Sequence, residues 1–162
     1  MSSVKTSTAR AVADLAEGYL LASVEVAAPP ERVFRALTSK EVVDWWVRPG
    51  VFDTREWTGE LRVGGGWRAS GVANGRPYVL EGEFLEIDPP QRLAHTWHAV
   101  GAAGAPTTVA YLLERLGGGT RITLRHTGFT SRESCAKTAI GWETSFDCLT
   151  DTLAAEVPLS RE

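Results

Sequence analysis

The stretch TSRESCAKTAIGWETSFDCLTDTLAAE, residues 130–156, decides the fold of this chain. Its apolar side chains recur at alternating steps of four and three residues, the spacing of one apolar stripe along an α-helix. The stripe consists of Cys135, Ala139, Trp142, Phe146, Leu149 and Leu153. Thr130 stands three residues before Glu133, a capping-box spacing for a helix start, and Pro158 bars continuation soon after Glu156. The pattern predicts a helix of about seven turns, one side of which the rest of the chain must cover.

Before this helix the chain begins with one strand and two short helices. Residues 19–27 alternate apolar and polar side chains, a pattern typical of a β-strand. Residues 31–37 and 38–46 carry apolar side chains at helical spacing, and Thr38 three residues before Glu41 indicates a second capping box. The sequence therefore predicts two short helices directly after the first strand.

About six short strand patterns follow, separated by Gly- and Pro-rich turns. Asn74-Gly75 is the strongest hairpin signal among these turns. The alternation is ambiguous between Tyr78 and Asp88, and a bulge or bend at Gly82 would reconcile its two phases. Three later strands have clear inner faces. These faces consist of Leu93, His95, Trp97 and Ala99, of Val109, Tyr111 and Leu113, and of Ile122, Leu124 and His126.

Together these elements predict an α+β fold in which a curved antiparallel sheet of about seven strands wraps around the C-terminal helix. No strand-helix-strand spacing calls for a parallel sheet, and the apolar faces of sheet and helix can cover each other. We expect residues 1–18 to form a loosely held leader, in which residues 9–17 could make a short helix. The single domain then spans residues 19–157, and residues 158–162 form a tail.

The composition is that of an ordinary globular domain. The chain has 162 residues, of which 43% are hydrophobic and 23% charged, and its net charge of −3 gives no electrostatic reason to expect nucleic acid or an anionic membrane as partner. No apolar run is long enough for a membrane span. Cys135 and Cys148 lie about 20 Å apart on the proposed helix and cannot form a disulfide with each other. We therefore expect a cytoplasmic protein, and both a monomer and a homodimer are compatible with the sequence.

The order of several short motifs resembles the activator-of-Hsp-ninety-ATPase homologue family, a branch of the helix-grip superfamily (also called SRPBCC, START or Bet v 1-like). The resemblance covers residues 19–155. It is carried by Ala28-Pro29-Pro30 with Val33, Phe34, Ala36, Leu37 and Thr38; Trp45-Trp46 with Pro49; Gly64-Gly65 with Trp67; Gly82-Glu83 with Glu86-Ile87-Asp88-Pro89-Pro90, Leu93 and Thr96-Trp97; Gly119-Thr120-Arg121 with Thr123-Leu124, His126 and Gly128-Phe129; and Gly141-Trp142.

This resemblance implies a seven-stranded sheet that grips the C-terminal helix, with a cavity between them that holds apolar small molecules in relatives. It implies less about activity, because the superfamily includes carriers, polyketide cyclases, hormone receptors and chaperone regulators. The eukaryotic chaperone activator carries a separate N-terminal domain, in place of which this sequence has only a short leader. The resemblance therefore supports chaperone activation less than it supports ligand binding.

The aromatic residues are too numerous to be scattered over a surface, and they indicate either a filled core or the wall of a ligand cavity. With two histidines, they give the candidate ligand-binding residues. The candidates are Trp45, Trp46, Trp67, Tyr78, Phe84, His95, Trp97, Tyr111, His126, Trp142 and Phe146. Indole and phenol groups would add a polar edge that orients a ring-bearing ligand.

The sequence predicts no metal site, no cofactor and no covalent chemistry. His95 and His98 lie three residues apart in a strand, so they point to opposite faces and cannot bind one ion. His126 is either a buried imidazole that is hydrogen-bonded to a neighbour or an acid/base at the end of a cavity, near His95. Gly64-Gly65-Gly66 is predicted to be a turn, and no serine or cysteine stands in a nucleophile motif.

Two further features have alternative interpretations. Gly141 stands within the long helix, where it costs about 1 kcal/mol relative to Ala, so either close packing of the sheet or a cavity lies beside it. Four arginines flank the aromatic region and either meet an anionic ligand at a pocket mouth or are solvated surface residues. They are Arg48, Arg55, Arg62 and Arg68.

The leading hypothesis is a protein that binds a small hydrophobic or aromatic ligand between the sheet and the C-terminal helix. One alternative is a protein-interaction module that acts on a chaperone or another partner. The other is a polyketide cyclase-like enzyme that uses His126, His95 or Tyr111 as proton donor.

Overall fold

The computed structural model of this chain describes residues 7–102 and 104–155. Three helices lie within these residues: α1 (Pro30–Leu37), α2 (Val42–Trp45) and α3 (Arg132–Ala154). The strands are β1 (Arg10–Asp14), β2 (Tyr19–Val26), β3 (Val47–Arg48), β4 (Phe52–Gly59), β5 (Gly66–Ala73), β6 (Arg76–Asp88), β7 (Arg92–Ala99), β8 (Thr107–Leu116) and β9 (Gly119–Thr127).

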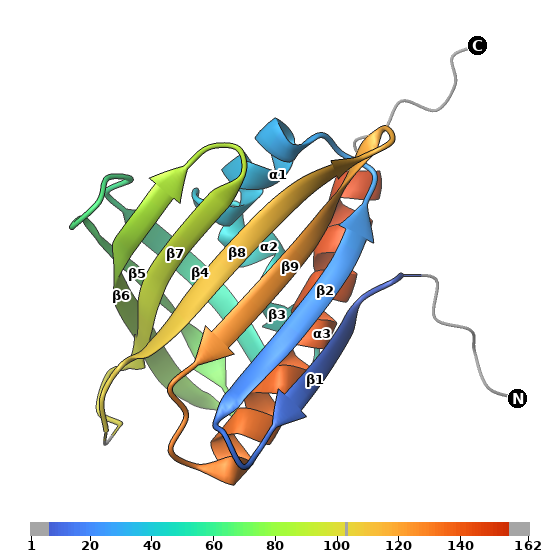
Figure 1. Cartoon of the computed structure of the whole chain (residues 1–162). Coiled ribbons are helices and arrows are strands. Elements are labelled where there is room, and N and C mark those ends of the chain that lie inside the picture. Colours follow the sequence, from blue (N-terminus) through green and yellow to red (C-terminus); the bar gives the residue numbers. More distant parts are fainter. Residues whose placement is uncertain (1–6, 103, 156–162) are drawn as a thin grey trace, which may run out of the picture.

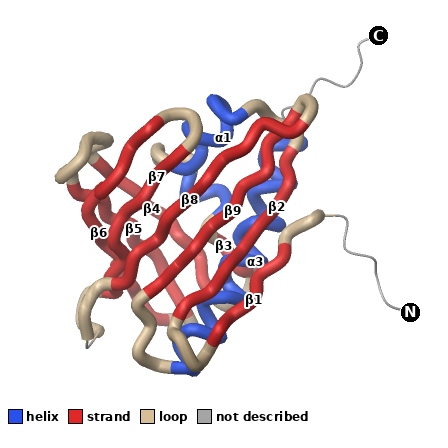
Figure 2. The backbone as a smooth tube through the Cα atoms, in the orientation of Figure 1, coloured by secondary structure: helices blue, strands red, loops and turns tan. Residues whose placement is uncertain are grey.

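All the strands form one antiparallel sheet in the order β1-β2-β9-β8-β7-β6-β5-β4-β3. The sheet curls, so that β4 and β5 lie behind β7 and β8 in the view of Figure 1, and α3 lies behind β2 and β9. All three helices lie on the inner side of this curl (Figure 2). The predicted α+β helix-grip architecture is confirmed, and the sheet has nine strands where about seven were expected.

The long helix carries the predicted stripe, and every member of it is buried. The start of the helix differs from the prediction by one residue. Ser131 is the N-cap, and its side chain accepts a hydrogen bond from the backbone N–H of Ser134 at 3.1 Å, so Thr130 does not cap the helix. Pro158, the expected stop, lies outside the described residues.

The N-terminal segment contains a strand where a loosely held leader or a short helix was expected. β1 pairs with β2 from Arg10 opposite Ser23 to Asp14 opposite Tyr19. This pairing satisfies the backbone groups of β2, which would otherwise be an open sheet edge. β1 is also tied to α3, because the backbone N–H of Ala11 donates to the carboxylate of Glu143 at 3.0 Å. Residues 1–6 lie outside the described part of the chain.

Two local predictions in the strands have different outcomes. The hairpin at Asn74-Gly75 is confirmed: both residues have positive φ, 52° and 79°, and connect β5 to β6. The irregularity in β6 exists, but the register shift lies between Phe84 and Glu86 and not at Gly82. Gly82 serves close packing, because a Cβ there would lie 2.0 Å from the carbonyl oxygen of Thr96.

The second capping box is also absent. The hydroxyl of Thr38 donates to the carbonyl oxygen of Phe34 at 2.7 Å and so closes the end of α1. Glu41 pairs with two arginines of α1, with its carboxylate 2.6 Å from Arg32 and 3.0 Å from Arg35. α2 therefore begins without a side-chain cap and is held by its neighbours.

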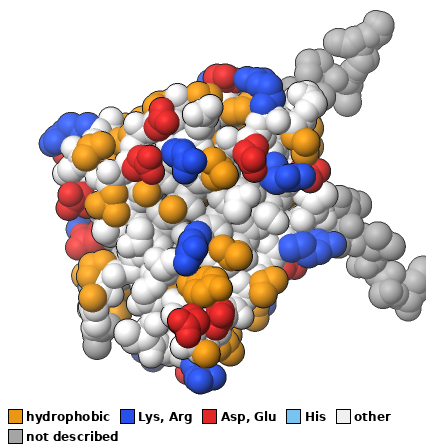
Figure 3. Space-filling model, viewed as in Figure 1, with side chains coloured by type: hydrophobic (Ala, Val, Ile, Leu, Met, Phe, Trp, Pro, Cys, Tyr) orange, Lys and Arg blue, Asp and Glu red, His pale blue; other side chains and the backbone are white. Residues whose placement is uncertain are grey.

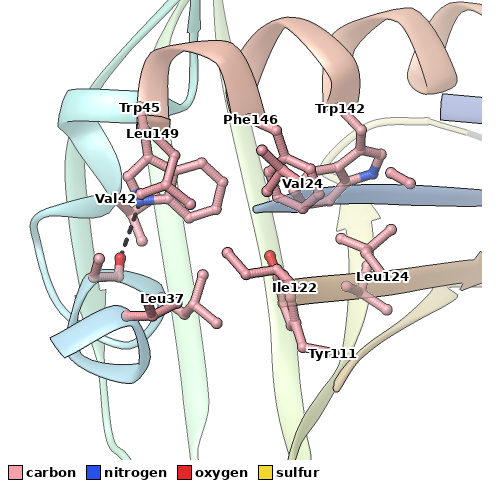
Figure 4. Packing of buried hydrophobic residues seen from close by; sticks show 14 of the residues in the cluster. Val24, Leu37, Val42, Trp45, Tyr111, Ile122, Leu124, Trp142, Phe146 and Leu149 are labelled. Carbon is pink, nitrogen blue, oxygen red and sulfur yellow. Dashed lines mark hydrogen bonds between the residues drawn. The ribbon is translucent and has the colours of Figure 1, made fainter. Parts of the chain in front are cut away.

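Buried apolar side chains fill the space between α3, the first two helices and the strands β2, β8 and β9 (Figure 4). Trp45 of α2 anchors this core, because its indole Nε1–H donates to the carbonyl oxygen of Ala36 at 3.0 Å. Its ring lies 6.2 Å from that of Phe146 on α3. The filled core lies toward the C-terminal half of α3, and the other half of the interior contains a pocket.

Candidate functional site

A pocket of about 450 Å³ lies between the N-terminal half of α3 and the strands β4, β6 and β7. Its large apolar residues are Trp46, Val51, Phe52, Leu80, Trp97 and Trp142. Its polar and charged residues are Arg48, Thr54, Asn74, Tyr78, Lys137, Thr138 and Ser145, and Ala73 and Gly141 complete the lining. A concave site with mostly apolar walls and a few polar groups is the usual form of a small-molecule site.

The register of the strands explains why residues from separate segments meet here. Arg48 of β3 pairs with Phe52 of β4, which pairs with Ala73 of β5, so these three side chains share one face of the sheet. Thr54 follows Phe52 by two residues and points to the same face. The pocket wall is therefore a continuous face of the curled sheet.

Three tryptophans form one aromatic side of the wall. The ring of Trp46 lies 5.0 Å from Trp97 and 6.1 Å from Trp142, and the rings of Trp97 and Trp142 are 5.4 Å apart. They come from the C-terminal end of α2, from β7 and from α3. Contacts at these distances hold the three rings in place, so they form a fixed aromatic wall for a ligand.

The indole of Trp46 stands out by its hydrogen bonding. Its Nε1–H is buried and has no acceptor among the residues that the structure describes. The indoles of Trp45, Trp67 and Trp142 each donate, to Ala36, Thr96 and His126 respectively. A buried donor without an acceptor costs about 1–3 kcal/mol, so the indole N–H of Trp46 is an unused donor in the interior.

Thr54 and Tyr78 supply a polar pair on the strand side of the pocket. Their hydroxyls hydrogen-bond to each other across Gly71, which lies between them in the register of β4, β5 and β6. A Cβ at Gly71 would lie 2.0 Å from the carbonyl oxygen of Asp53, so only glycine fits there. Burial raises the pKa of the Tyr78 phenol, which therefore stays neutral at physiological pH.

Gly141 opens the helix side of the pocket. A Cβ built there would meet only one atom, Cε1 of Phe52, at 3.8 Å. Close sheet packing therefore does not require the glycine, and the cavity is the correct one of the two interpretations. Thr138, Gly141, Trp142 and Ser145 are spaced i, i+3, i+4 and i+7, so they form one face of α3.

The structure divides the eleven candidate residues into two groups. Four of them line the pocket: Trp46, Tyr78, Trp97 and Trp142. The other seven pack in the interior beside it: Trp45, Trp67, Phe84, His95, Tyr111, His126 and Phe146. The ligand-binding role of the first group stays a prediction. Four further lining residues were not among the candidates: Phe52, Thr54, Leu80 and Ser145. Alternation along β4 could have indicated Phe52 and Thr54, and helical spacing from Trp142 could have indicated Ser145.

His126 belongs to a closed hydrogen-bond chain behind the pocket wall. Its Nδ1 accepts from the indole of Trp142 at 3.0 Å, and its Nε2 lies 2.6 Å from the hydroxyl of Thr107. That hydroxyl donates to the carbonyl oxygen of Trp97 at 3.1 Å, so Nε2 must carry the donated proton and the imidazole is neutral. Burial, with a smaller contribution from His95, lowers the pKa of His126 to about 3.

His95 is also a buried neutral imidazole. Burial lowers its pKa to about 4, and its Nδ1 lies 2.9 Å from the carbonyl oxygen of Thr96. Tyr111 lies beside it, with ring centroids 6.1 Å apart, and burial raises the pKa of that phenol. None of His95, Tyr111 and His126 lines the pocket. Among the described residues there is also no group of three or more His, Cys, Asp and Glu side chains that could hold a metal ion.

The curled sheet, the gripped helix and the pocket between them define a helix-grip protein. The chain belongs to the family described as "Activator of Hsp90 ATPase homolog 1-like protein", whose profile matches residues 27–154. A comparison with curated proteins gives no match. No helix in the part of the chain that the structure describes combines the length and the apolar character needed to cross a membrane.

Solved structures agree with this assignment. A protein from Rhodobacter sphaeroides has a TM-score of 0.73 at 25% identity, with 91% of this chain and 98% of that chain covered. The AHSA1 protein from Silicibacter pomeroyi has a TM-score of 0.72 at 25% identity, with 86% and 99% covered. CalU16 from Micromonospora echinospora, at 23% identity and a TM-score of 0.63, shares the fold over 93% of this chain and 88% of its own.

Proposed function

We propose that this protein binds a small hydrophobic or aromatic molecule in the pocket between the sheet and α3. One observation carries the proposal: about 450 Å³ of space borders three mutually packed indoles, one of which holds a buried N–H without an acceptor. The volume falls within the range of roughly 300–1,000 Å³ that is typical of small-molecule sites. Its polar groups come from several separate elements, as expected for groups that orient a ligand.

The other two hypotheses have less support. His95, Tyr111 and His126, the proton donors of a cyclase-like enzyme, do not reach the pocket, and both imidazoles are neutral. For a protein-interaction module, the face of the sheet in Figure 3 has apolar side chains interspersed with charged ones and no broad apolar patch. The cytoplasmic location and the monomeric or homodimeric state stay predictions.

Native mass spectrometry of the protein purified from its own cells tests the proposal. We expect a retained small molecule that leaves on denaturation. Titration with a panel of ring-bearing and aliphatic apolar compounds should also quench the intrinsic fluorescence, because Trp46, Trp97 and Trp142 border the pocket. The proposal would be wrong if no retained molecule were found and no compound of the panel changed the fluorescence.

A further inference from the structure

Arg48 differs from the other arginines that flank the aromatic region. Three of these arginines are exposed and lie within ion-pair distance of a carboxylate: Arg55 at 3.1 Å from Asp53, Arg62 at 3.5 Å from Glu60 and Arg68 at 3.6 Å from Glu81. Arg48 is half-buried, lines the pocket and has no ion pair or side-chain hydrogen bond among the described residues. Its guanidinium therefore has donors to offer to a ligand.

The pocket as a whole is positive, although the protein carries a net charge of −3. Arg48 and Lys137 line it, and none of the described lining residues is Asp or Glu. Lys137 pairs with Glu133 at 3.0 Å, but both side chains are well exposed, so water screens this pair. Trp46 and Arg48 both line the pocket, and neither side chain can accept a hydrogen bond.

The positive charges at the pocket also distinguish a site for cations from a site for anions. Three tryptophans with rings about 5–6 Å apart resemble the cages that bind quaternary ammonium ions by cation–π interaction. Such a ligand would be repelled by Arg48 and Lys137, and no lining carboxylate would offset the repulsion. An anion would instead be attracted by these charges, and the planar guanidinium of Arg48 can donate two parallel hydrogen bonds to a carboxylate.

We propose that the ligand of this pocket is a hydrophobic organic anion, a carboxylate on an aromatic or aliphatic body. The acid group lies against the guanidinium of Arg48, which lines the pocket and has no carboxylate partner among the described residues. The apolar body lies among Phe52, Trp97 and Trp142, which border the same cavity. This inference rests on the proposed function and specifies the class of its ligand.

Three probes of nearly equal shape test the charge preference: 1-naphthoate, 1-naphthamide and 1-naphthylmethylammonium. Isothermal titration calorimetry at low salt should give 1-naphthoate an affinity at least about tenfold higher than that of the neutral amide, because a charge-assisted hydrogen bond in a partly buried site is worth more than a neutral one. The ammonium probe should bind weakest. High salt should reduce the preference for the anion.

Variants assign that preference to one side chain. Arg48→Gln should bring the affinities for 1-naphthoate and 1-naphthamide to within about twofold of each other. Arg48→Lys should keep part of the preference, because lysine has the positive charge but lacks the planar guanidinium that donates two parallel hydrogen bonds. Arg55→Gln, an arginine outside the pocket with its own carboxylate, is the matched control and should behave as the wild type. Thermal unfolding of each variant checks that it folds.

The outcomes separate this inference from the proposed function. If the amide or the ammonium probe bound as tightly as 1-naphthoate, the anionic ligand class would be wrong while binding of a ring-bearing molecule would stand. The same conclusion would follow if Arg48→Gln kept the full preference. If none of the three probes bound, the inference of an anionic ligand would be wrong. Native mass spectrometry of the purified protein would then decide the proposed function by itself.

Discussion

The interior of this protein has a filled half and a hollow half, and α3 borders both. In the filled half, Phe146, Leu149 and Leu153 of α3 are fully buried against a core that includes Trp45. In the hollow half, the same helix presents Thr138, Gly141 and Ser145 to the pocket. The large side chains at the C-terminal half of α3 fill one half of the interior. The small side chains Thr138, Gly141 and Ser145 leave space beside Trp142 in the other half.

The two halves also differ in how their polar groups are used. In the filled half, the indole of Trp45 donates to the carbonyl oxygen of Ala36 at 3.0 Å. At the pocket wall, the indole of Trp46 has no acceptor and Arg48 has no carboxylate partner among the described residues. The comparison teaches that the pocket wall includes two side chains, Trp46 and Arg48, whose donors have no acceptor among the described residues. The predictions below test this division.

The largest effect is expected from shortening a core residue in the filled half. Phe146→Ala should destabilise the protein by about 3–5 kcal/mol, because it removes a fully buried ring and leaves a cavity. Leu80→Ala, on the half-buried pocket wall, should cost less than about 2 kcal/mol, since space already exists beside it. Chemical denaturation measures both values. Equal costs would mean that the two halves are packed alike.

The two buried histidines behind the pocket wall should make the stability of the protein sensitive to acid. The folded-state pKa values of His95 and His126, about 4 and about 3, lie below the ordinary 6.5, so the unfolded chain binds these protons more readily. Their stabilisation is thus fully present above pH 6.5 and is lost as the pH falls toward 4 and 3. Each should contribute a slope of about 1.4 kcal/mol per pH unit in that window.

Denaturant titrations at several pH values measure this slope, and His95→Gln and His126→Gln should each reduce it. If both variants kept the wild-type slope between pH 6.5 and 4, the histidines would not be the cause.

Much of the fold could be predicted because it depends on periodicity. The spacing from Cys135 to Leu153 predicts α3, and alternation predicts the inner faces of β8 and β9. The predicted inner face of β7 holds at Leu93 and His95, whereas Ala99 at the end of the strand is exposed. The misses depend on contacts that sequence spacing does not contain. β1 forms because it pairs with the edge strand β2. Its residue Ala11 also donates a backbone hydrogen bond to Glu143, which is far away in the sequence. Ser131 caps α3 because its own backbone is extended, with φ of −115°.

The site could be predicted less well, because an inner-facing aromatic residue can line a pocket or fill a core. Trp45 and Trp46 are adjacent and both contact Trp142 of α3, but only Trp46 lines the pocket, and neither composition nor spacing reveals this difference. Arg48 could not be separated from Arg55 for the same reason. Arg48 lines the pocket because it pairs with Phe52, and this pairing depends on the register of the sheet.

Gly141 allows the hollow half to be filled at little structural cost. Gly141→Ala should stabilise the protein by about 1 kcal/mol, because alanine is the better helix former and its methyl group meets only Phe52 at 3.8 Å. Gly141→Leu should occupy the pocket and abolish probe binding. Calorimetric titration with 1-naphthoate and thermal unfolding give both readouts. Ile140→Ala, on the exposed face of α3, is the control and should leave binding unchanged. Binding that survives Gly141→Leu would place the ligand elsewhere.

The smallest effect isolates the unused donor of Trp46. Trp46→Phe and Trp67→Phe remove similar volumes from rings that are 5.7 Å apart, both nearly fully buried. Only Trp67 gives up a hydrogen bond, the 3.2 Å one to the carbonyl oxygen of Thr96. Trp67→Phe should therefore cost about 1 kcal/mol more than Trp46→Phe in free energy of unfolding. Chemical denaturation of the two variants gives this difference. A Trp46→Phe variant as destabilised as Trp67→Phe would show that the Trp46 donor already has a partner in solution, and the contrast between the two halves would lose its polar component.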